Sequence, residues 1–178
     1  CFPASEKSGN PAYLSAFIEN TAPTIWNSTP QRLEQLLTFS SARNKPLDLS
    51  SFRLFLFSGD FLSPVLIRSL PIDFSRTTLV NLGGATETTI WSNYYILNNA
   101  KNTSDPIAYG SPMPFATYHV LSESFAFVEP GEKGELYIEG ACLARGYLAE
   151  PIINDRFIPA PWNPDARLYR TGDLVSRE

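Results

Sequence analysis

A glycine-rich turn followed by a hydroxyl and a carboxylate is the first pattern in the sequence with the residue types for chemistry. It reads Gly83-Gly84-Ala85-Thr86-Glu87 and comes directly after an apolar, β-rich run. Two glycines let backbone amides approach a ligand without obstruction by side chains. Because Mg²⁺ prefers oxygen ligands, the pattern fits a site in which Thr86 contacts a phosphate oxygen and Glu87 holds the metal. The same residues also fit a plain strand-to-helix turn, with Thr86 as a cap and Glu87 favoured by the helix dipole.

Two further motifs follow in the second half of the chain. Residues Gly134 to Leu148 combine a strand-like run, a glycine-rich bend and an Arg-Gly-Tyr, which places a cation and an aromatic ring at the rim of a site. Residues Tyr169 to Leu174 contain Asp173 after a Thr-Gly turn, and such a carboxylate can accept two hydrogen bonds from the vicinal hydroxyls of a ribose. A hairpin with a surface arginine and an aspartate that closes a tight turn are the structural alternatives.

The elements that position the first motif alternate between strand and helix. Helical spacing predicts helices over 11–18, after Pro30 and from Ser63 to Leu70, and apolar β-rich runs predict strands at 24–26, 52–57 and 77–82. This alternation is typical of an α/β fold, a parallel sheet with flanking helices. The loops at Asn27, Ser58 and 83–87 then share the carboxyl edge of the sheet, where ligands bind in such folds.

The pattern changes near residue 109, so we expect two parts, 1–108 (α/β, parallel sheet) and 109–178 (β-rich). Short runs at 118–121, 125–128 and 135–139 are bounded by Pro and Gly and predict a smaller antiparallel β subdomain, distorted and barrel-like. The polar run 98–105 is the candidate hinge between the two parts.

Composition narrows the class of partner and the compartment. The 178 residues carry a formal net charge of -4 with scattered Lys and Arg, which argues against nucleic acid or an anionic membrane surface. No window approaches the ~18 uninterrupted apolar residues of a membrane span. Two cysteines are too few for a disulfide framework, so we expect a cytoplasmic protein. Both ends of the sequence look cut, and we expect a piece of a longer chain.

The order and spacing of the three motifs resemble the core motifs of adenylation domains of nonribosomal peptide synthetases, within the adenylate-forming superfamily. Gly83 to Glu87 is similar to the family's Gly-x-Thr-Glu motif, Gly134 to Leu148 to its Gly-Glu-Leu…Ala-Arg-Gly-Tyr motif, and Tyr169 to Leu174 to its Tyr-Arg-Thr-Gly-Asp-Leu motif. The resemblance covers essentially the whole chain, as the later part of the large subdomain.

The resemblance implies a ligase that forms an aminoacyl adenylate from ATP and an amino acid and passes it to the phosphopantetheine thiol of a peptidyl carrier domain. It implies ATP and Mg²⁺ as cofactors and other synthetase domains as partners. Thr86 and Glu87 become the catalytic pair and Glu87 the metal ligand. The implied nucleotide-binding residues are Asn81, Gly83, Gly84, Ala85, Thr86 and Asp173.

Two positions depart from the family pattern. An aromatic residue that stacks on adenine is usual where this chain has Gly83, and a glycine is usual where it has Cys142. Cys142 stands beside apolar neighbours, so we expect a packing role for its thiol. His119, the only histidine, is expected to be a structural residue rather than a base.

The substrate pocket that the resemblance implies is similar to the set found in cysteine-activating domains, with serine or another small amino acid as the next choice. A small apolar chamber with one hydroxyl suits a short thiol side chain. Ordinary core packing is the alternative for the apolar members. The implied set is Asn27, Leu56, Ser58, Leu82, Ile90 and Trp91.

Two other interpretations of the chain stay open. One is an acyl- or aryl-acid ligase of the same superfamily, and the other is a non-catalytic adenylation-like scaffold within a megasynthase. We find no Ser/Thr/Gly-rich phosphate loop and no C-terminal catalytic lysine of the family type, so we expect the 178 residues alone not to catalyse adenylation.

Overall fold

The computed structural model describes residues 3–97, 107–148 and 154–177. The expected hinge at 98–105 and Cys1 lie outside these ranges. The chain divides into two compact units, one made of residues 1–82 and 95–110 and the other of 83–94 and 111–178. The boundary that we expected near residue 108 stays a prediction, because the second unit also takes the short segment 83–94.

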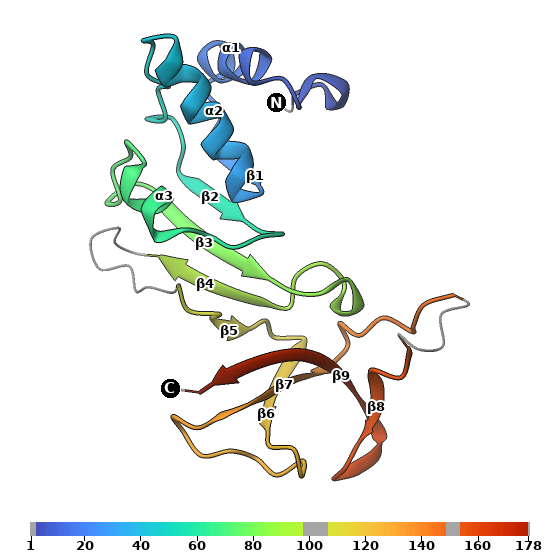
Figure 1. Ribbon diagram of the computed structural model, residues 1–178. Coiled ribbons are helices and arrows are strands. Elements are labelled where there is room, and N and C mark those ends of the chain that lie inside the picture. The colour runs from blue at the N-terminus through green and yellow to red at the C-terminus, as the bar shows by residue number, and fades with distance from the viewer. Residues whose placement is uncertain (1–2, 98–106, 149–153, 178) are drawn as a thin grey trace. The chain divides into compact units, whose positions relative to one another are not determined.

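Unit 1 is built around parallel strands. β1 (Ile25–Ser28), β2 (Leu54–Phe57) and most of β3 (Thr78–Gly83) pair in parallel in that order, and β4 (Asn93–Leu97) lies next to β3 (Figure 1). The helices between them are α1 (Pro11–Thr21), α2 (Pro30–Ala42) and α3 (Pro64–Ser69), after a short 3-10 turn η1 (Ser5–Lys7). The expected parallel sheet with flanking helices is confirmed.

Capping residues fix where these helices begin. The Asn10 side chain accepts hydrogen bonds from the backbone of Ala12 and Tyr13, and Ser63 accepts one from Val65. Each helix has a proline in its first turn, where no backbone donor is needed. Thr29 holds the cap position of α2 without a side-chain hydrogen bond. The α2 helix buries Leu33 and Leu36 completely or nearly so, as its spacing predicts.

The core of unit 1 is built around aromatic residues in and next to β2. Phe52, Phe55 and Phe57 are at most 1% exposed, and their rings pack against one another. Trp26 of β1 meets Phe52 edge to face. The buried residues of β2 alternate along the strand and so lie on one of its faces. Burying these aromatic side chains removes a large apolar area from water, at roughly 25 cal/mol per Å².

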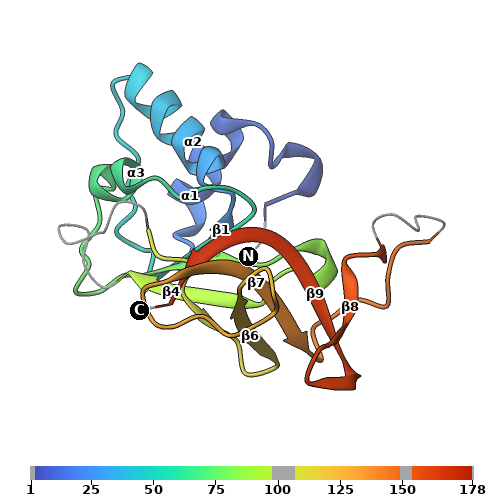
Figure 2. The ribbon, with the colours of Figure 1, turned by 60° about the horizontal axis from the view of Figure 1, so that its bottom comes forward.

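Unit 2 is an antiparallel sheet with one unusually long strand. β6 (Ala116–Leu121), β7 (Lys133–Gly140), β9 (Asn163–Ser176) and β8 (Phe157–Ala160) lie side by side in that order. Figure 2 shows β9 as a continuous curved strand that accompanies first β8 and then β7. The first two residues of β4 pair with β5 (Ser111–Pro112) in the same unit. The expected antiparallel, β-rich part is confirmed.

Three local expectations are corrected. Residues 125–128 form no strand, because Phe125 takes a left-handed backbone (φ 61°) and only Phe127 makes an isolated bridge to Leu121. The strand expected at 24–26 begins one residue later and includes Asn27 and Ser28, which pair with β2. The Thr171-Gly172 turn is a bulge inside β9.

Candidate functional site

The glycine turn at the end of β3 is shaped by close backbone contacts. Gly83 is the last residue of β3, and its carbonyl accepts a hydrogen bond from the Ser92 backbone (2.9 Å). A Cβ on Gly84 would stand 2.5 Å from the Ile90 carbonyl oxygen and 2.8 Å from the Ser92 nitrogen. Only glycine fits there, so the turn depends on the second glycine of the motif.

The two polar side chains that we expected to act in the first motif follow this turn. Thr86 and Glu87 open η2 (Thr86–Thr88), a short 3-10 turn that the Thr88 hydroxyl ties to the backbone of Ala85 (3.0 Å). The cap position is Ala85, so the alternative in which Thr86 caps a helix is wrong. Thr86 is exposed and Glu87 is half-buried, which leaves the hydroxyl and the carboxylate accessible to a ligand.

Glu87 joins the first motif to the second. Its carboxylate Oε1 accepts a hydrogen bond from the Tyr147 hydroxyl (3.1 Å), and its backbone carbonyl accepts one from the Ala144 nitrogen (2.7 Å). A third bond runs from the Thr89 hydroxyl to the Cys142 carbonyl (2.7 Å). The Arg-Gly-Tyr segment is therefore attached to the turn, and its tyrosine points at the carboxylate.

Two tyrosines around Glu87 are held in the neutral form. The hydrogen bond to Glu87 is the main cause that raises the pKa of Tyr147 above its ordinary value, followed by burial. Burial, followed by a hydrogen bond to Glu87, raises the pKa of Tyr169 to about 12, and the nearby Arg156 opposes this rise. At neutral pH the Tyr147 hydroxyl keeps its proton and donates a hydrogen bond to the Glu87 carboxylate.

The third motif places Asp173 on a bulge of β9. Leu174 pairs with Glu135 and Arg170 with Tyr137, so three residues of β9 face one residue of β7. The Thr171 hydroxyl accepts from the Asp173 nitrogen (3.0 Å) and donates to the Leu136 carbonyl (2.8 Å). The bulge presents Asp173 as an exposed carboxylate.

An ion pair fastens the third motif to the second. The Arg170 Nε donates to Glu135 Oε1 at 2.8 Å, and the Glu135 side chain is only 18% exposed. The hydrogen bond from Arg170 is the main cause that holds the pKa of Glu135 below its ordinary value. All three sequence motifs are thus connected within unit 2, through Glu87–Tyr147 and through Glu135–Arg170.

The partly exposed Glu87 carboxylate supplies oxygen atoms of the kind that Mg²⁺ prefers as ligands. In nucleotide-binding sites Mg²⁺ is held by one or two carboxylates together with phosphate oxygens and water, and a complete protein cage is not required. The described ranges contain no group of three or more His, Cys, Asp or Glu side chains able to hold a metal.

The expected substrate-binding residues fall into both units. In unit 1, Asn27 pairs with Leu56 across β1 and β2, and Ser58 follows directly, with its nitrogen bonded to the Ser28 carbonyl (3.3 Å). Asn81 lies beside Phe57 across β2 and β3. The parallel ladders therefore bring the carboxyl ends of β1, β2 and β3 together, as expected.

The remaining pocket candidates differ in exposure. Leu82 is buried (7% exposed), so core packing accounts for it in part. Ile90, in unit 2, is 70% exposed and has a left-handed backbone (φ 75°), and its neighbour Trp91 is half-buried. Core packing does not explain Ile90. The binding roles of the whole set stay predictions.

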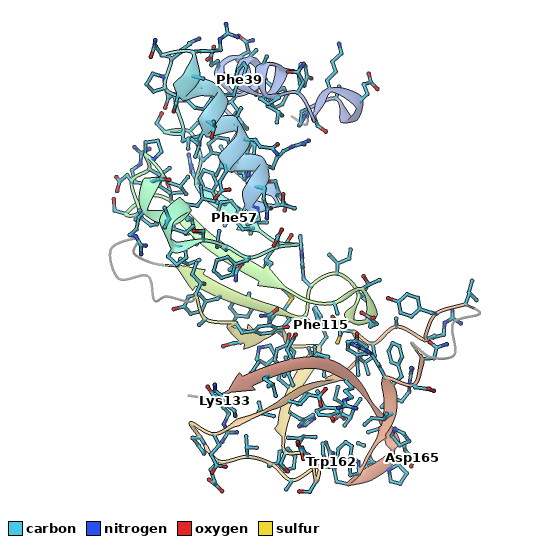
Figure 3. The ribbon with its side chains drawn as sticks, viewed as in Figure 1. Phe39, Phe57, Phe115, Lys133, Trp162 and Asp165 are labelled. Carbon is cyan, nitrogen blue, oxygen red and sulfur yellow. The ribbon has the colours of Figure 1, made fainter. Side chains whose placement is uncertain are left out.

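Cys142 and His119 behave as structural residues. Cys142 is 4% exposed and packs with Ala116, Leu136 and Ile138, and burial raises the pKa of its thiol. The His119 Nε2 lies 2.8 Å from Glu139 Oε2. Its ring packs edge-on against Trp162, which Figure 3 labels between β8 and β9.

Sequence reasoning missed several residues of the site. It placed Tyr147 at the rim of a site and named no hydrogen-bonding partner for it. It gave no role to Tyr169, Asn154 or Arg156. The Asn154 Oδ1 accepts a hydrogen bond from the Tyr147 nitrogen (2.7 Å), and its Nδ2 donates one to the Tyr147 carbonyl (2.9 Å). The Arg156 Nη1 donates to the Thr171 carbonyl (3.2 Å). Neither Asn154 nor Arg156 stands out in the sequence, since both act through contacts that only the fold creates.

The glycine turn, the half-buried Glu87 carboxylate and the exposed Asp173 carboxylate lie in one unit. Residues 1–148 match the family model described as AMP-binding enzyme, and the chain belongs to this family. Its relatives are nonribosomal peptide synthetases, so it is of their adenylation-domain type. The described helices include none that is long and apolar enough to cross a membrane.

The chain is similar to parts of much longer synthetases. It is 36% identical over 165 residues to the dimodular nonribosomal peptide synthase of Bacillus subtilis (strain 168), which covers 92% of this chain and 6% of that protein. It is 36% identical over 173 residues to pyochelin synthetase PchE of Pseudomonas aeruginosa (strain UCBPP-PA14), which covers 96% of this chain and 12% of that protein. Among solved structures, holo-AB3403, a four-domain nonribosomal peptide synthetase bound to AMP and glycine, matches 97% of this chain and 12% of its own length, at 30% identity and a TM-score of 0.78.

Proposed function

We propose that this chain is part of an amino-acid-activating domain that forms aminoacyl-AMP from ATP and an amino acid. The carboxylate of the amino acid attacks the α-phosphorus of ATP, an O–P bond forms, and pyrophosphate leaves. The product is then loaded onto the phosphopantetheine thiol of a carrier domain, with AMP as the leaving group. The family match and the similarity to a synthetase bound to AMP and glycine support this proposal.

The observation that carries the proposal is the environment of Glu87. Its carboxylate follows a glycine turn that only glycine can form, and the Tyr147 hydroxyl donates to it at 3.1 Å. When bound, Mg²⁺ supplies charge stabilisation for the phosphate oxygens. Glu87 would hold that ion and Thr86 would donate to a phosphate oxygen. Preorganised groups of this kind lower the barrier without taking part in bond making.

The proposed nucleotide contacts complete this assignment. Asp173, exposed on the β9 bulge, accepts hydrogen bonds from the ribose hydroxyls. Asn81 and the backbone of Gly83, Gly84 and Ala85 border the adenine. A ring stacked on the base from position 83 is absent, because this position is glycine.

Cysteine is the substrate that we favour, with serine or another small amino acid next. Ser58 is half-buried and directly follows β2, two residues after the apolar Leu56. This combination suits a short, soft side chain. The other members of the proposed set are Asn27, Leu82, Ile90 and Trp91.

ATP–pyrophosphate exchange tests the proposal, measured on the complete natural polypeptide that contains this sequence and screened against all amino acids. We expect exchange with cysteine, and its loss in Glu87→Ala. Glu123→Ala is the matched control, because Glu123 is an exposed glutamate of the same unit. Exchange with another amino acid keeps the enzyme class and rejects cysteine, whereas exchange with acyl or aryl acids only identifies a ligase of that type. A folded polypeptide without any exchange identifies a non-catalytic scaffold.

A further inference from the structure

The Tyr147 hydroxyl and the Glu87 carboxylate form a hydrogen bond between segments sixty residues apart (3.1 Å). Tyr147 is half-buried, and so is Glu87. A carboxylate has about four lone-pair sites, so one hydroxyl donor fixes its orientation and still leaves sites for a cation. Tyr147 therefore has the position of a residue that orients a metal-binding side chain, here Glu87, without touching the metal itself.

The backbone of Tyr147 is itself held on both sides by one side chain. Asn154 Oδ1 accepts from the Tyr147 nitrogen at 2.7 Å, and Asn154 Nδ2 donates to the Tyr147 carbonyl at 2.9 Å. A Cβ on Gly146 would stand 2.7 Å from the same Oδ1, so the amide fits closely against this backbone. Two bonds to one peptide segment fix both its position and its direction, and hence the direction of the Tyr147 side chain.

The other end of the contact is equally constrained. The Glu87 carbonyl accepts from the Ala144 nitrogen at 2.7 Å, so backbone and side chain of Glu87 are bound to the same short segment, 144–147. Glu87 therefore has little freedom to turn away from the orientation that Tyr147 gives it.

We propose that Tyr147 is a positioning residue for the metal-binding carboxylate of Glu87, and that Asn154 acts through Tyr147. The inference rests on the proposed function, because it concerns the same nucleotide site. It goes further in assigning two residues outside the glycine turn to the affinity for the metal–nucleotide complex. Outer partners of metal ligands are worth about 10- to 100-fold in affinity or activity.

A purely structural role of the same contact makes a different prediction. If Tyr147 only fastens two loops, its loss disturbs the turn at 83–87 as a whole and weakens every nucleotide alike. If it orients Glu87, its loss weakens the binding that depends on the metal and spares the binding that does not. AMP without a divalent cation and a non-hydrolysable ATP analogue with Mg²⁺ separate these two cases.

The experiment measures both affinities by titration calorimetry on the complete polypeptide, for wild type and for Tyr147→Phe. We expect the Mg²⁺–ATP analogue to bind about 10- to 100-fold more weakly to Tyr147→Phe, with AMP affinity unchanged. Mn²⁺ binding followed by electron paramagnetic resonance, in the presence of the analogue, gives an independent readout of the metal. Tyr137→Phe is the matched control, because the Tyr137 hydroxyl donates to another glutamate, Glu135, at 3.2 Å.

A second variant keeps the proposal testable if Tyr147→Phe does not fold. Asn154→Asp retains the acceptor for the Tyr147 nitrogen and loses the donor to its carbonyl, so we expect a smaller loss with the same preference for the metal complex. Equal weakening of AMP and of the metal complex overturns the inference, as does an unchanged affinity of both variants for the metal complex. Glu87→Ala separates the two proposals. If this variant binds the Mg²⁺–ATP analogue as strongly as wild type does, or if wild type binds no nucleotide, the proposed function fails together with the inference.

Discussion

The buried side chain of Asn93 occupies the space in which a Cβ atom on Gly83 would stand. Asn93 is 1% exposed, and a Cβ at position 83 would also lie only 3.0 Å from its Cγ. The resemblance to adenylation domains leads one to expect an aromatic residue at this position. The glycine at position 83 therefore has a physical reason. Asn93, the first residue of β4, fills the space in which the Cβ of an aromatic residue at position 83 would lie.

Gly83→Ala is predicted to destabilise unit 2 by about 1–3 kcal/mol, the usual cost of forcing an extra carbon into a packed site. Urea titration of the variant and of wild type measures the free energy of unfolding. Gly9→Ala is the matched control, since a Cβ on Gly9 meets nothing within 4 Å. In an Asn93→Ala background the same substitution should cost less, because the opposing side chain is gone. An equal cost in both backgrounds would contradict the steric explanation.

Ile90→Gly is predicted to raise stability. Ile90 has φ 75°, a conformation that strains a β-branched residue, and its side chain is 70% exposed and contributes little to the core. Relief of such strain is worth about 1 kcal/mol or more, which corresponds to a rise in Tm of about 2–4 °C for a chain of this size. Ile90→Val keeps the branched Cβ and should leave Tm unchanged. If Ile90 also lines the substrate pocket, Ile90→Gly should weaken the selection among amino acids in the exchange assay.

The Glu135–Arg170 pair predicts a pH dependence of stability. The pKa of Glu135 is lower in the folded chain than its ordinary value of 4.5, because Arg170 favours the charged form. The stabilisation is therefore complete above about pH 5 and is lost as the pH falls through the lowered folded-state pKa. Glu135→Gln should lower the urea midpoint at pH 7 and converge with wild type at acidic pH. A constant difference between the two proteins across that range would show that the pair does not cause it.

Cys142 is predicted to resist alkylation in the folded protein. Burial raises the pKa of its thiol, and the thiolate is the reactive form. Mass spectrometry of the peptide that contains Cys142, after treatment with iodoacetamide, should find little modification without urea and complete modification in urea. Rapid labelling in native buffer would mean that this thiol is accessible. Cys142→Ser should also destabilise the sheet, because a hydroxyl would replace a thiol among Leu136, Ile138 and Ala116.

Periodicity and capping residues were enough to predict the architecture. The alternation of apolar runs with helical spacing led to the parallel β1–β2–β3 ladder, and Pro30 and Ser63 marked the helix starts. The three motifs, compared with a known family, indicated which side chains to examine. What these signals have in common is that they are local, or are carried by the order of motifs along the chain.

The contacts that organise the site are not local, which is why the sequence did not predict them. Tyr147 is sixty residues from Glu87, and nothing in the Arg-Gly-Tyr segment names its partner. The Thr171-Gly172 pair has the composition of a turn, and pairing of β9 with β7 on both sides of it converts it into a bulge. In each case tertiary pairing decides between local alternatives that the residue types leave open.

The length of β9 has a consequence for the order in which unit 2 folds. Residues 163–169 of the strand pair with β8, close by in sequence. Residues 168–176 pair with β7, where Lys133 meets Ser176 at the far end of the ladder. The nearby hairpin can close quickly, whereas the distant ladder must first bring remote segments together. We therefore expect the hairpin of β8 and β9 to form early in refolding and the pairing of β7 with β9 to be the slow step. Since that pairing creates the bulge that carries Asp173, the chain acquires its third motif only near the end of folding.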